Sequence, residues 1–504
     1  MNRKIGVILS YALMVFEVFS TLLLTPFIIR ALGQAEYGVY KLAAAINAYL
    51  LLLDLGVGNA VTRYVSKFRV ENNKEQSEKF LGIATVYYLV IAVIAIIAGL
   101  VLVAVFPSAF AKGLTDSEIA LGQKLLAITM VNSAVTLGSA AYNNVIIAYE
   151  KFAVSKGFSI LQIILRIIMT FSALKLGFGS IGIVTVNLIT TILCRAFFVF
   201  YVIIVLKLKP KFKGIETGFA KEIVAYSSLI LLQMVATQIN SNVDQVLIGA
   251  LVSSSAVILA VYGVGSQICQ YFQSIGSAFT NVLMPGIVKM IESKASSKQI
   301  TDEMIRIGRM VLIVLMLIWG GFIVNGEQFI ILWAGKANKE AFKVALILMT
   351  AYVFILAESV GSQILWAMNE HREQSFLKVG IVLANIVLTV LLIKWNPLIG
   401  ATVGTFISLM AGDVITMNVI FVKKLKISLS SYYLGLFKGI LPCTVLTVII
   451  GFLTREFFPK SWFGLLCSIA VMTVIYGAGI LLFGMNSYEK GLAKSMINKI
   501  LKRS

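Results

Sequence analysis

Long apolar segments recur along the whole chain and constrain its fold more than any other feature. Apolar residue types fill 59% of the 504 positions, whereas only 13% of the residues are charged. A water-soluble protein could not bury that much apolar surface, so lipid must solvate much of it. The segments do not alternate as barrel strands do, and the 7 prolines leave long helices possible. The sequence therefore predicts an all-α polytopic membrane protein.

The apolar segments predict about 14 transmembrane helices, since each is close to twenty residues or longer. The predicted spans are residues 6–29, 38–61, 80–104, 122–147, 158–176, 180–206, 223–251, 255–287, 304–325, 341–366, 376–394, 398–422, 433–454 and 461–484. The first segment is too long for a signal peptide and lacks a small-residue cleavage site. We expect it to stay in the membrane.

Basic residues fall in alternate loops, which predicts the orientation of the chain. With the N-terminus inside, the inner segments hold, for example, Arg63, Lys151, Arg306 and Arg309, while the outer loops are short or mixed in charge. Topology and anionic lipid then account for the net charge of +20, and nucleic acid is not implied. Both termini are predicted to be cytoplasmic. The lysine-rich tail 485–504 is predicted to form an amphipathic helix that lies on the inner leaflet.

A block of six predicted helices occurs twice in the chain. Tyr40 aligns with Tyr262 at an offset of 222, and Gly182 aligns with Gly400 at 218. Both copies contain an even number of spans, so a pseudo-two-fold axis along the membrane normal should relate them. We predict an N-terminal lobe (1–206), a basic cytoplasmic linker (207–222), a C-terminal lobe (223–422), helices 13 and 14 (423–484) and the basic tail (485–504).

Seven ionisable residues lie well inside the predicted spans. Each would cost about 3 kcal/mol if it faced lipid, so we expect them to face a wet cavity or one another. They are Glu17, Asp54, Arg166, Arg195, Asp244, Glu358 and Asp413. Arg195 and Asp413 are equivalent in the repeat, at an offset of 218. Local structural ion pairs remain the alternative for every one of them.

Uncharged polar residues form stripes at helical spacing in three of the spans. They predict either a solvated vestibule or polar contacts between helices, and the sequence leaves both open. The predicted cavity-lining residues are Gln233, Thr237, Asn240, Ser241, Gln267, Gln270, Ser274, Asn132 and Thr136.

No motif in the sequence indicates catalysis. The chain lacks the phosphate-binding GxxxxGK[ST] pattern as well as HExxH and CxxC, and its only histidine is His371 in a predicted loop. The four cysteines lie in apolar segments without metal-binding spacing, which indicates packing residues. We expect neither an enzyme nor a bound metal or cofactor.

Four segments carry a resemblance to a known family. They are ALGQAEYGVYKLAAAI (31–46), LLDLGVGNAVTRYVSK (52–67), NVDQVLIGAL (242–251) and ILWAGK (331–336). With them the chain resembles the polysaccharide transporter (Wzx-like) oligosaccharide flippases of the multidrug/oligosaccharidyl-lipid/polysaccharide exporter superfamily. The resemblance implies a bacterial plasma-membrane protein whose two lobes open a central cavity alternately to either side. It also implies transfer of a lipid-linked oligosaccharide, usually on undecaprenyl pyrophosphate, to the outer leaflet, and possible partners in the polymerase machinery.

A diphosphate headgroup needs cationic partners, and arginine offers a donor fork that matches phosphate oxygens. We therefore predict headgroup binding by Arg166 and Arg195, with Arg30 and Arg63 flanking the first two spans. The five intramembrane acids are candidates for gating or for coupling to Na⁺ or H⁺.

Two other functions stay open. Glu17 together with Pro26 in the first span is similar to cation-coupled multidrug antiporters of the same superfamily. A scaffold or ligase in glycan assembly is disfavoured, because the outer segments 105–121 and 326–340 are short and apolar.

Overall fold

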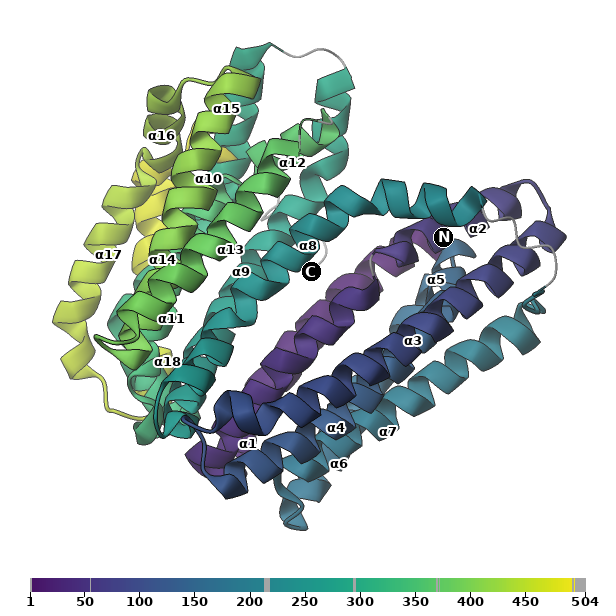
Figure 1. Ribbon diagram of the computed structural model, residues 1–504. Helices are drawn as coiled ribbons and strands as arrows, with labels where there is room; N and C mark the ends of the chain where they lie inside the picture. Colours follow the sequence, from purple (N-terminus) through teal and green to yellow (C-terminus); the bar gives the residue numbers. More distant parts are fainter. Residues whose placement is uncertain are drawn as a thin grey trace. The chain divides into compact units, whose positions relative to one another are not determined.

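The computed structural model describes residues 2–54, 56–212, 218–292, 296–368, 370, 372–491 and 494 (Figure 1). Within these residues all regular structure is helical, which confirms the all-α fold. The α-helices are α1 (Asn2–Leu50), α2 (Val57–Val70), α3 (Lys74–Phe110), α4 (Asp116–Gly138), α5 (Ala140–Ala148), α6 (Phe152–Lys175), α7 (Gly179–Phe200), α8 (Gly218–Leu251), α9 (Ser255–Glu292), α10 (Ser297–Ala334), α11 (Ala341–Ala357), α12 (Ser359–Ala367), α13 (Arg372–Leu392), α14 (Pro397–Leu409), α15 (Met417–Leu425), α16 (Leu429–Phe437), α17 (Ile440–Thr454) and α18 (Trp462–Gly479).

Shorter 3-10 or π segments join or extend these helices. They are η1 (Leu51–Asp54), η2 (Tyr201–Val205), η3 (Lys336–Asn338), η4 (Met410–Thr416), η5 (Arg455–Phe457) and η6 (Ile480–Gly484).

The number of membrane spans differs from the prediction. Among the described residues, 11 helical stretches are long and apolar enough to cross a membrane, or up to 12 if the bent pair α11 and α12 counts as one span. The count of 14 is therefore not confirmed. The first two predicted spans share α1, which is interrupted at Gly33 by φ 72 and ψ 176. Only glycine adopts such a conformation readily, so this residue fixes the place of the break.

The chain divides into two compact units, Met1–Ala260 and Val261–Ser504. The first unit includes α8, which the sequence repeat assigns to the C-terminal lobe. The lobe boundaries at residues 206 and 223 stay predictions. The predicted linker lies partly outside the described residues, and so do His371 and most of the predicted amphipathic tail.

In the first unit, a charged end is formed where α2, α3 and the α5–α6 turn meet. The Arg69 guanidinium donates to the Ala148 carbonyl at 2.9 Å and pairs with Glu150 at 3.2 Å. Glu78 of α3 pairs with Lys211 at 3.1 Å, beyond the end of α7. These contacts hold together α2, the start of α3, the α5–α6 turn and the segment after α7, all of which the charge pattern places on the cytoplasmic side.

At the opposite end of the first unit, the turns of α1, α3–α4, α6–α7 and α8–α9 gather (Figure 1). The Glu36 carboxylate, which follows the Gly33 break, accepts from the Ser180 amide at 2.7 Å and from its hydroxyl at 2.6 Å. It thereby satisfies free N–H groups at the start of α7, as N-terminal capping groups do.

In the second unit, α10 is the central helix and packs against α11, α16, α17 and α18. Its start is fixed by a capping box in which Ser296 and Gln299 bond each other's backbone amides. Asn325 of α10 accepts a hydrogen bond from Ser468 of α18 at 2.9 Å. Helices α13 and α14 form an adjacent hairpin.

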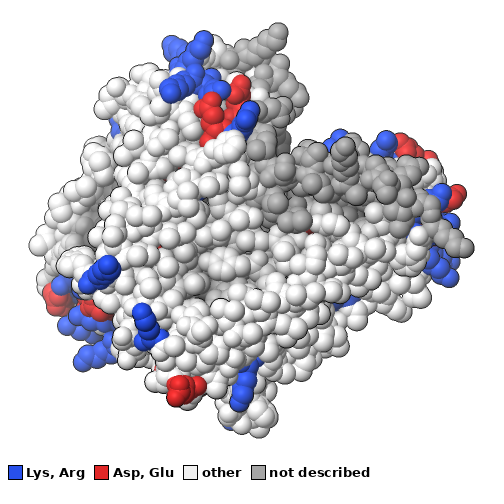
Figure 2. Space-filling model, in the orientation of Figure 1, with Lys and Arg blue, Asp and Glu red and all other residues white. Residues whose placement is uncertain are grey.

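The surfaces of both units are consistent with lipid contact. Charged side chains gather near helix ends and leave broad uncharged faces between them (Figure 2). On α3, for example, Leu89, Ile97 and Leu100 are each more than half exposed. The cysteines are free, and Cys194, Cys269 and Cys443 are buried, which agrees with their interpretation as packing residues.

Candidate functional site

Arg166 occupies a half-buried position in α6, which packs closely against α1. Its guanidinium lies close enough to the Tyr40 hydroxyl of α1 for an electrostatic interaction. Arg195 is also half-buried, in the neighbouring α7, and its guanidinium lies 5.7 Å from the centre of the Phe198 ring. No ion pair with a carboxylate joins either arginine within the described part of the chain. The structure thus gives the first unit two intramembrane cations on adjacent helices.

The other two predicted headgroup residues lie elsewhere. Arg30 is exposed and precedes the break at Gly33, at the end of the unit where the turns gather. Arg63 is exposed on α2, which ends at the charged end of the unit. The four arginines are therefore spread over both ends and the middle of the first unit, and their joint role stays a prediction.

Sequence reasoning missed Lys41, a further cation in the second half of α1. Its side chain is half-buried and its ammonium lies 5.8 Å from the centre of the Tyr37 ring. Tyr37 is only 2% exposed. The signal is visible in the sequence, because Lys41 is a charged residue inside the predicted span 38–61.

The three acids of the first unit have different surroundings. Glu17 is exposed on α1, and Asp54 in η1 accepts a hydrogen bond from the Tyr88 hydroxyl at 2.8 Å. Asp244 of α8 is 2% exposed, and its charge acts on the hydroxyl of Tyr49 in α1. The structure does not bring these three acids into one cluster.

The second unit contains a buried carboxylate at a broken helix. Glu358 lies between α11 and α12, which are bent by 43°, and is 2% exposed. Its oxygens accept from the Asn418 amide at 3.2 Å and from the Tyr433 hydroxyl. Asn418 also donates to the Val414 carbonyl at 2.8 Å. Polar donors therefore hold the carboxylate, while no cation pairs with it among the described side chains.

Asp413 has a local cationic partner. In the π segment η4 its carboxylate pairs with the ammonium of Lys378, on α13, at 2.5 Å. Asp413 thus makes an ion pair of the kind that the structural alternative expected, and its role in gating or coupling stays a prediction. Lys378 was missed in the sequence because it stands near the start of its predicted span, where a snorkelling lysine is ordinary. The carboxylates of Asp413 and Glu358 are close enough to repel each other, so the two acids lie in the same part of the second unit.

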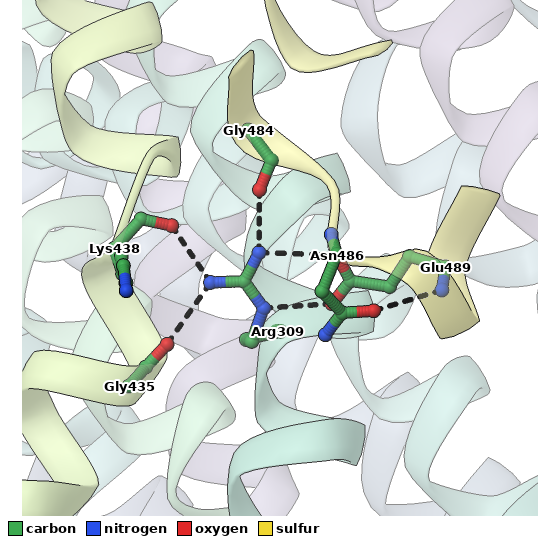
Figure 3. Close-up of polar contacts among 6 residues, drawn as sticks. All are labelled: Arg309, Gly435, Lys438, Gly484, Asn486 and Glu489. Atoms are coloured by element: carbon green, nitrogen blue, oxygen red, sulfur yellow. Dashed lines mark hydrogen bonds and ion pairs between the residues drawn. The ribbon is translucent and has the colours of Figure 1, made fainter. Parts of the chain in front are cut away.

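A second buried ion pair links α10 to the segment that follows η6 near the C-terminus (Figure 3). The Arg309 guanidinium binds both carboxylate oxygens of Glu489, at 2.7 and 3.0 Å. It also donates to the carbonyls of Gly435, Lys438 and Gly484 at 2.9, 2.7 and 2.6 Å. Its donors are all used, so Arg309 is structural and is not simply an inner-loop charge, as its position in the sequence suggested.

The predicted polar stripes are partly satisfied inside their own helices. The Ser241 hydroxyl donates to the Thr237 carbonyl, Ser274 donates to the Gln270 carbonyl, and Thr136 donates to the Asn132 carbonyl, at 2.8 to 2.9 Å. Gln267 is buried and bonds the Tyr271 hydroxyl, whereas Thr237, Ser241 and Gln270 are exposed.

The remaining stripe residues are half-buried. Gln233, Asn240 and Asn132 all fall in this class, and the Asn132 side-chain oxygen is buried without a hydrogen-bond partner. The stripes are therefore accessible in part, and their role as a vestibule stays a prediction. Within the described residues, no group of three or more His, Cys, Asp or Glu could hold a metal ion.

The comparisons with known proteins agree with this membrane architecture. Residues 6–291 match the family described as "Polysaccharide biosynthesis protein". No curated protein sequence matches the chain significantly. The fold is similar to that of the lipid II flippase MurJ in an inward closed conformation, with a TM-score of 0.73 and 16% identity over 94% of this chain and 97% of that one.

The fold is also similar to two other transporters of the MOP superfamily. An inward-facing multidrug resistance MATE transporter gives a TM-score of 0.60 and 11% identity, over 82% of this chain and 95% of that one. A MOP superfamily transporter from Pyrococcus furiosus gives 0.53 and 16%, over 84% and 97%. Such low identities show the fold alone. The family match covers more than half of the sequence, so this chain belongs to the polysaccharide biosynthesis protein family.

Proposed function

We propose that this protein is a flippase that moves a lipid-linked oligosaccharide from the inner to the outer leaflet of a bacterial plasma membrane. The carrier would be undecaprenyl pyrophosphate, and the product would feed assembly of a cell-surface polysaccharide. The family match and the flippase-like fold support this class of function. Transport would proceed by alternating access between the two predicted lobes, with both termini cytoplasmic and a polysaccharide polymerase as a possible partner.

The observation that carries the proposal is the pair of intramembrane arginines that have no carboxylate partner in the described part of the chain. Arg166 and Arg195 lie half-buried on the adjacent helices α6 and α7. Holding an unpaired cation within a membrane span costs about 3 kcal/mol, so an anionic ligand would relieve a real penalty. A guanidinium can bind two phosphate oxygens at once. Lys41 would add a third positive charge from α1.

The test is a flipping assay in proteoliposomes loaded with a fluorescent undecaprenyl-pyrophosphate oligosaccharide. Transfer is followed by the fraction of label that an impermeant quencher reaches. We expect Arg166→Gln and Arg195→Gln each to lower the flipping rate at least tenfold at equal protein levels. Lys175→Gln is the matched control, because it removes a charge from the same helix as Arg166 and lies at its end. Normal flipping by both arginine variants would overturn the headgroup assignment.

The runner-up function is a cation-coupled multidrug antiporter. It predicts drug efflux by the purified protein and no transfer of the glycolipid. Efflux without glycolipid transfer would replace the flippase proposal by this alternative.

We also propose that Glu358 binds a coupling proton. A buried ionised carboxylate without a cation is expensive, and protonation removes that charge. The titratable and polar groups near Glu358 are Asn418, Tyr432, Tyr433 and Asp413, and the Asp413 carboxylate pairs with Lys378. Glu358→Gln mimics the protonated form, so we expect transport that persists but no longer responds to a pH gradient. If wild-type transport is unchanged after the Na⁺ and H⁺ gradients are both collapsed, ion coupling is wrong.

A further inference from the structure

Three segments of the first unit meet where its turns gather. They are the second half of α1, the turn between α3 and α4, and the turn between α8 and α9. The Ser255 amide donates to the Gly113 carbonyl at 2.7 Å, and the Ser255 hydroxyl donates to the same oxygen at 3.0 Å. Ser255 is fully buried, so these bonds are shielded from solvent.

Glycines allow the backbones to approach very closely at this place. A Cβ added to Gly113 would lie 1.9 Å from the Gly249 carbonyl oxygen, and one added to Gly38 would lie 1.8 Å from that of Ala256. These neighbours are backbone atoms, which cannot rotate away. The contact therefore forms only if both positions lack a side chain.

Apolar side chains seal the space beside the glycines. Leu42 of α1 is fully buried and Phe110 of α3 is 4% exposed. A Cβ added to Gly249 would lie only 3.0 Å from a Leu42 methyl carbon and 3.1 Å from a Phe110 ring carbon. Both side chains therefore already pack against the Gly249 backbone. The junction is thus dry and closely packed.

We propose that this junction is a latch that closes the outer side of the transport pathway. The inference rests on the proposed alternating access. The sequence repeat assigns α1, α3 and α4 to one predicted lobe and α8 and α9 to the other, so alternating access between these lobes would part the helices that the junction joins. The charge pattern places its two turns, at 111–115 and 252–254, on the outer side of the membrane. We name Gly38, Gly113, Gly249, Ser255 and Ala256 the outer latch.

The latch has the properties of a two-state contact. Its bonds are made by one hydroxyl and two backbone groups, so breaking them exposes no buried charge. Its packing depends on the close approach of Gly38 and Gly113 to the backbone of α8 and α9, so a small separation of these helices removes all of it. Such an element switches between discrete arrangements and does not deform gradually.

Spin labels on either side of the latch provide the test. Lys112 and Ser253 are exposed and flank the contact on the two turns. Both are changed to cysteine in a variant that lacks Cys194, Cys269, Cys443 and Cys467, and pulsed electron resonance measures their distance in nanodiscs. We expect a predominant short distance in the parent protein. Gly113→Ala should shift the ratio of closed to open forms at least tenfold toward longer distances.

Two further variants make the result decisive. Ser255→Ala adds no atoms, so it should fold, and it should move the distance distribution in the same direction by a smaller amount. Gly157→Ala is the matched control, because nothing lies within 4 Å of an added Cβ there. If Gly113→Ala and Ser255→Ala both give the control's distribution, the latch is overturned.

The side of the membrane is tested with the same cysteines. An impermeant thiol reagent added outside intact cells should label positions 112 and 253, and failure to label either would overturn the outer placement. These readouts need no substrate. A latch that shifts as expected in a protein that moves no glycolipid would refute the proposed substrate alone, while normal flipping with an immobile latch would refute the latch alone.

Discussion

Arg309→Met removes the most heavily bonded cation in the second unit while keeping a long, flexible apolar side chain. The wild-type guanidinium and the Glu489 carboxylate are only 4% and 3% exposed. After the change, Glu489 keeps its hydrogen bond from the Asn486 amide at 2.9 Å but loses its only described cation. Three carbonyl groups also lose their donor.

The expected loss of stability follows from these contacts. Removing one partner of a buried ion pair costs about 3–5 kcal/mol, because the other charge stays buried. Each orphaned carbonyl adds about 1 kcal/mol where water cannot replace the donor. We therefore expect Arg309→Met to lower the free energy of unfolding by about 6–8 kcal/mol. The double variant Arg309→Met with Glu489→Leu should lose clearly less, since it buries no unpaired charge.

The measurement is unfolding in mixed micelles of increasing SDS content, followed by circular dichroism. Arg306→Met is the matched control on the same helix, because Arg306 is 40% exposed and pairs with Glu303 at 2.9 Å. A partly exposed pair of this kind, which water reaches, contributes about 0–1 kcal/mol. If Arg309→Met unfolds at the same SDS content as Arg306→Met, the reasoning about the buried pair is refuted.

Two further predictions concern α13 and α14. Gly400→Ala should destabilise the protein by about 1–3 kcal/mol, because its Cβ would lie 2.1 Å from the Leu392 carbonyl oxygen, whereas Gly380→Ala meets nothing within 4 Å and should be neutral or slightly stabilising in the same SDS titration. Lys378→Met should lower thermal stability in detergent more than the double variant with Asp413→Asn, because only the single change leaves the carboxylate without its partner at 2.5 Å. Equal stability of the single and double variants would show that this pair contributes nothing.

Several features were predictable because they depend on composition and order alone. Segment length and hydropathy predicted a helical membrane protein, since lipid demands that backbone groups be satisfied within each helix. The loop-charge pattern also placed Arg69 and Lys211 on the same side of the membrane, and both lie at the charged end of the first unit. The break between the first two spans was also expected, although only the structure identified Gly33 as its position.

The partners of the polar groups were decided by tertiary structure. Asp413 is 35 residues from Lys378, and Arg309 is 180 residues from Glu489, so no local pattern links them. Which side chains meet depends on the rotation and depth of each helix, and apolar surroundings specify neither. The sequence by itself thus determined the membrane class, the all-helical fold and most of the charges inside the spans. Only packing decided that Asp413 and Arg309 are paired internally, while Arg166 and Arg195 have no carboxylate partner among the residues that the structure describes.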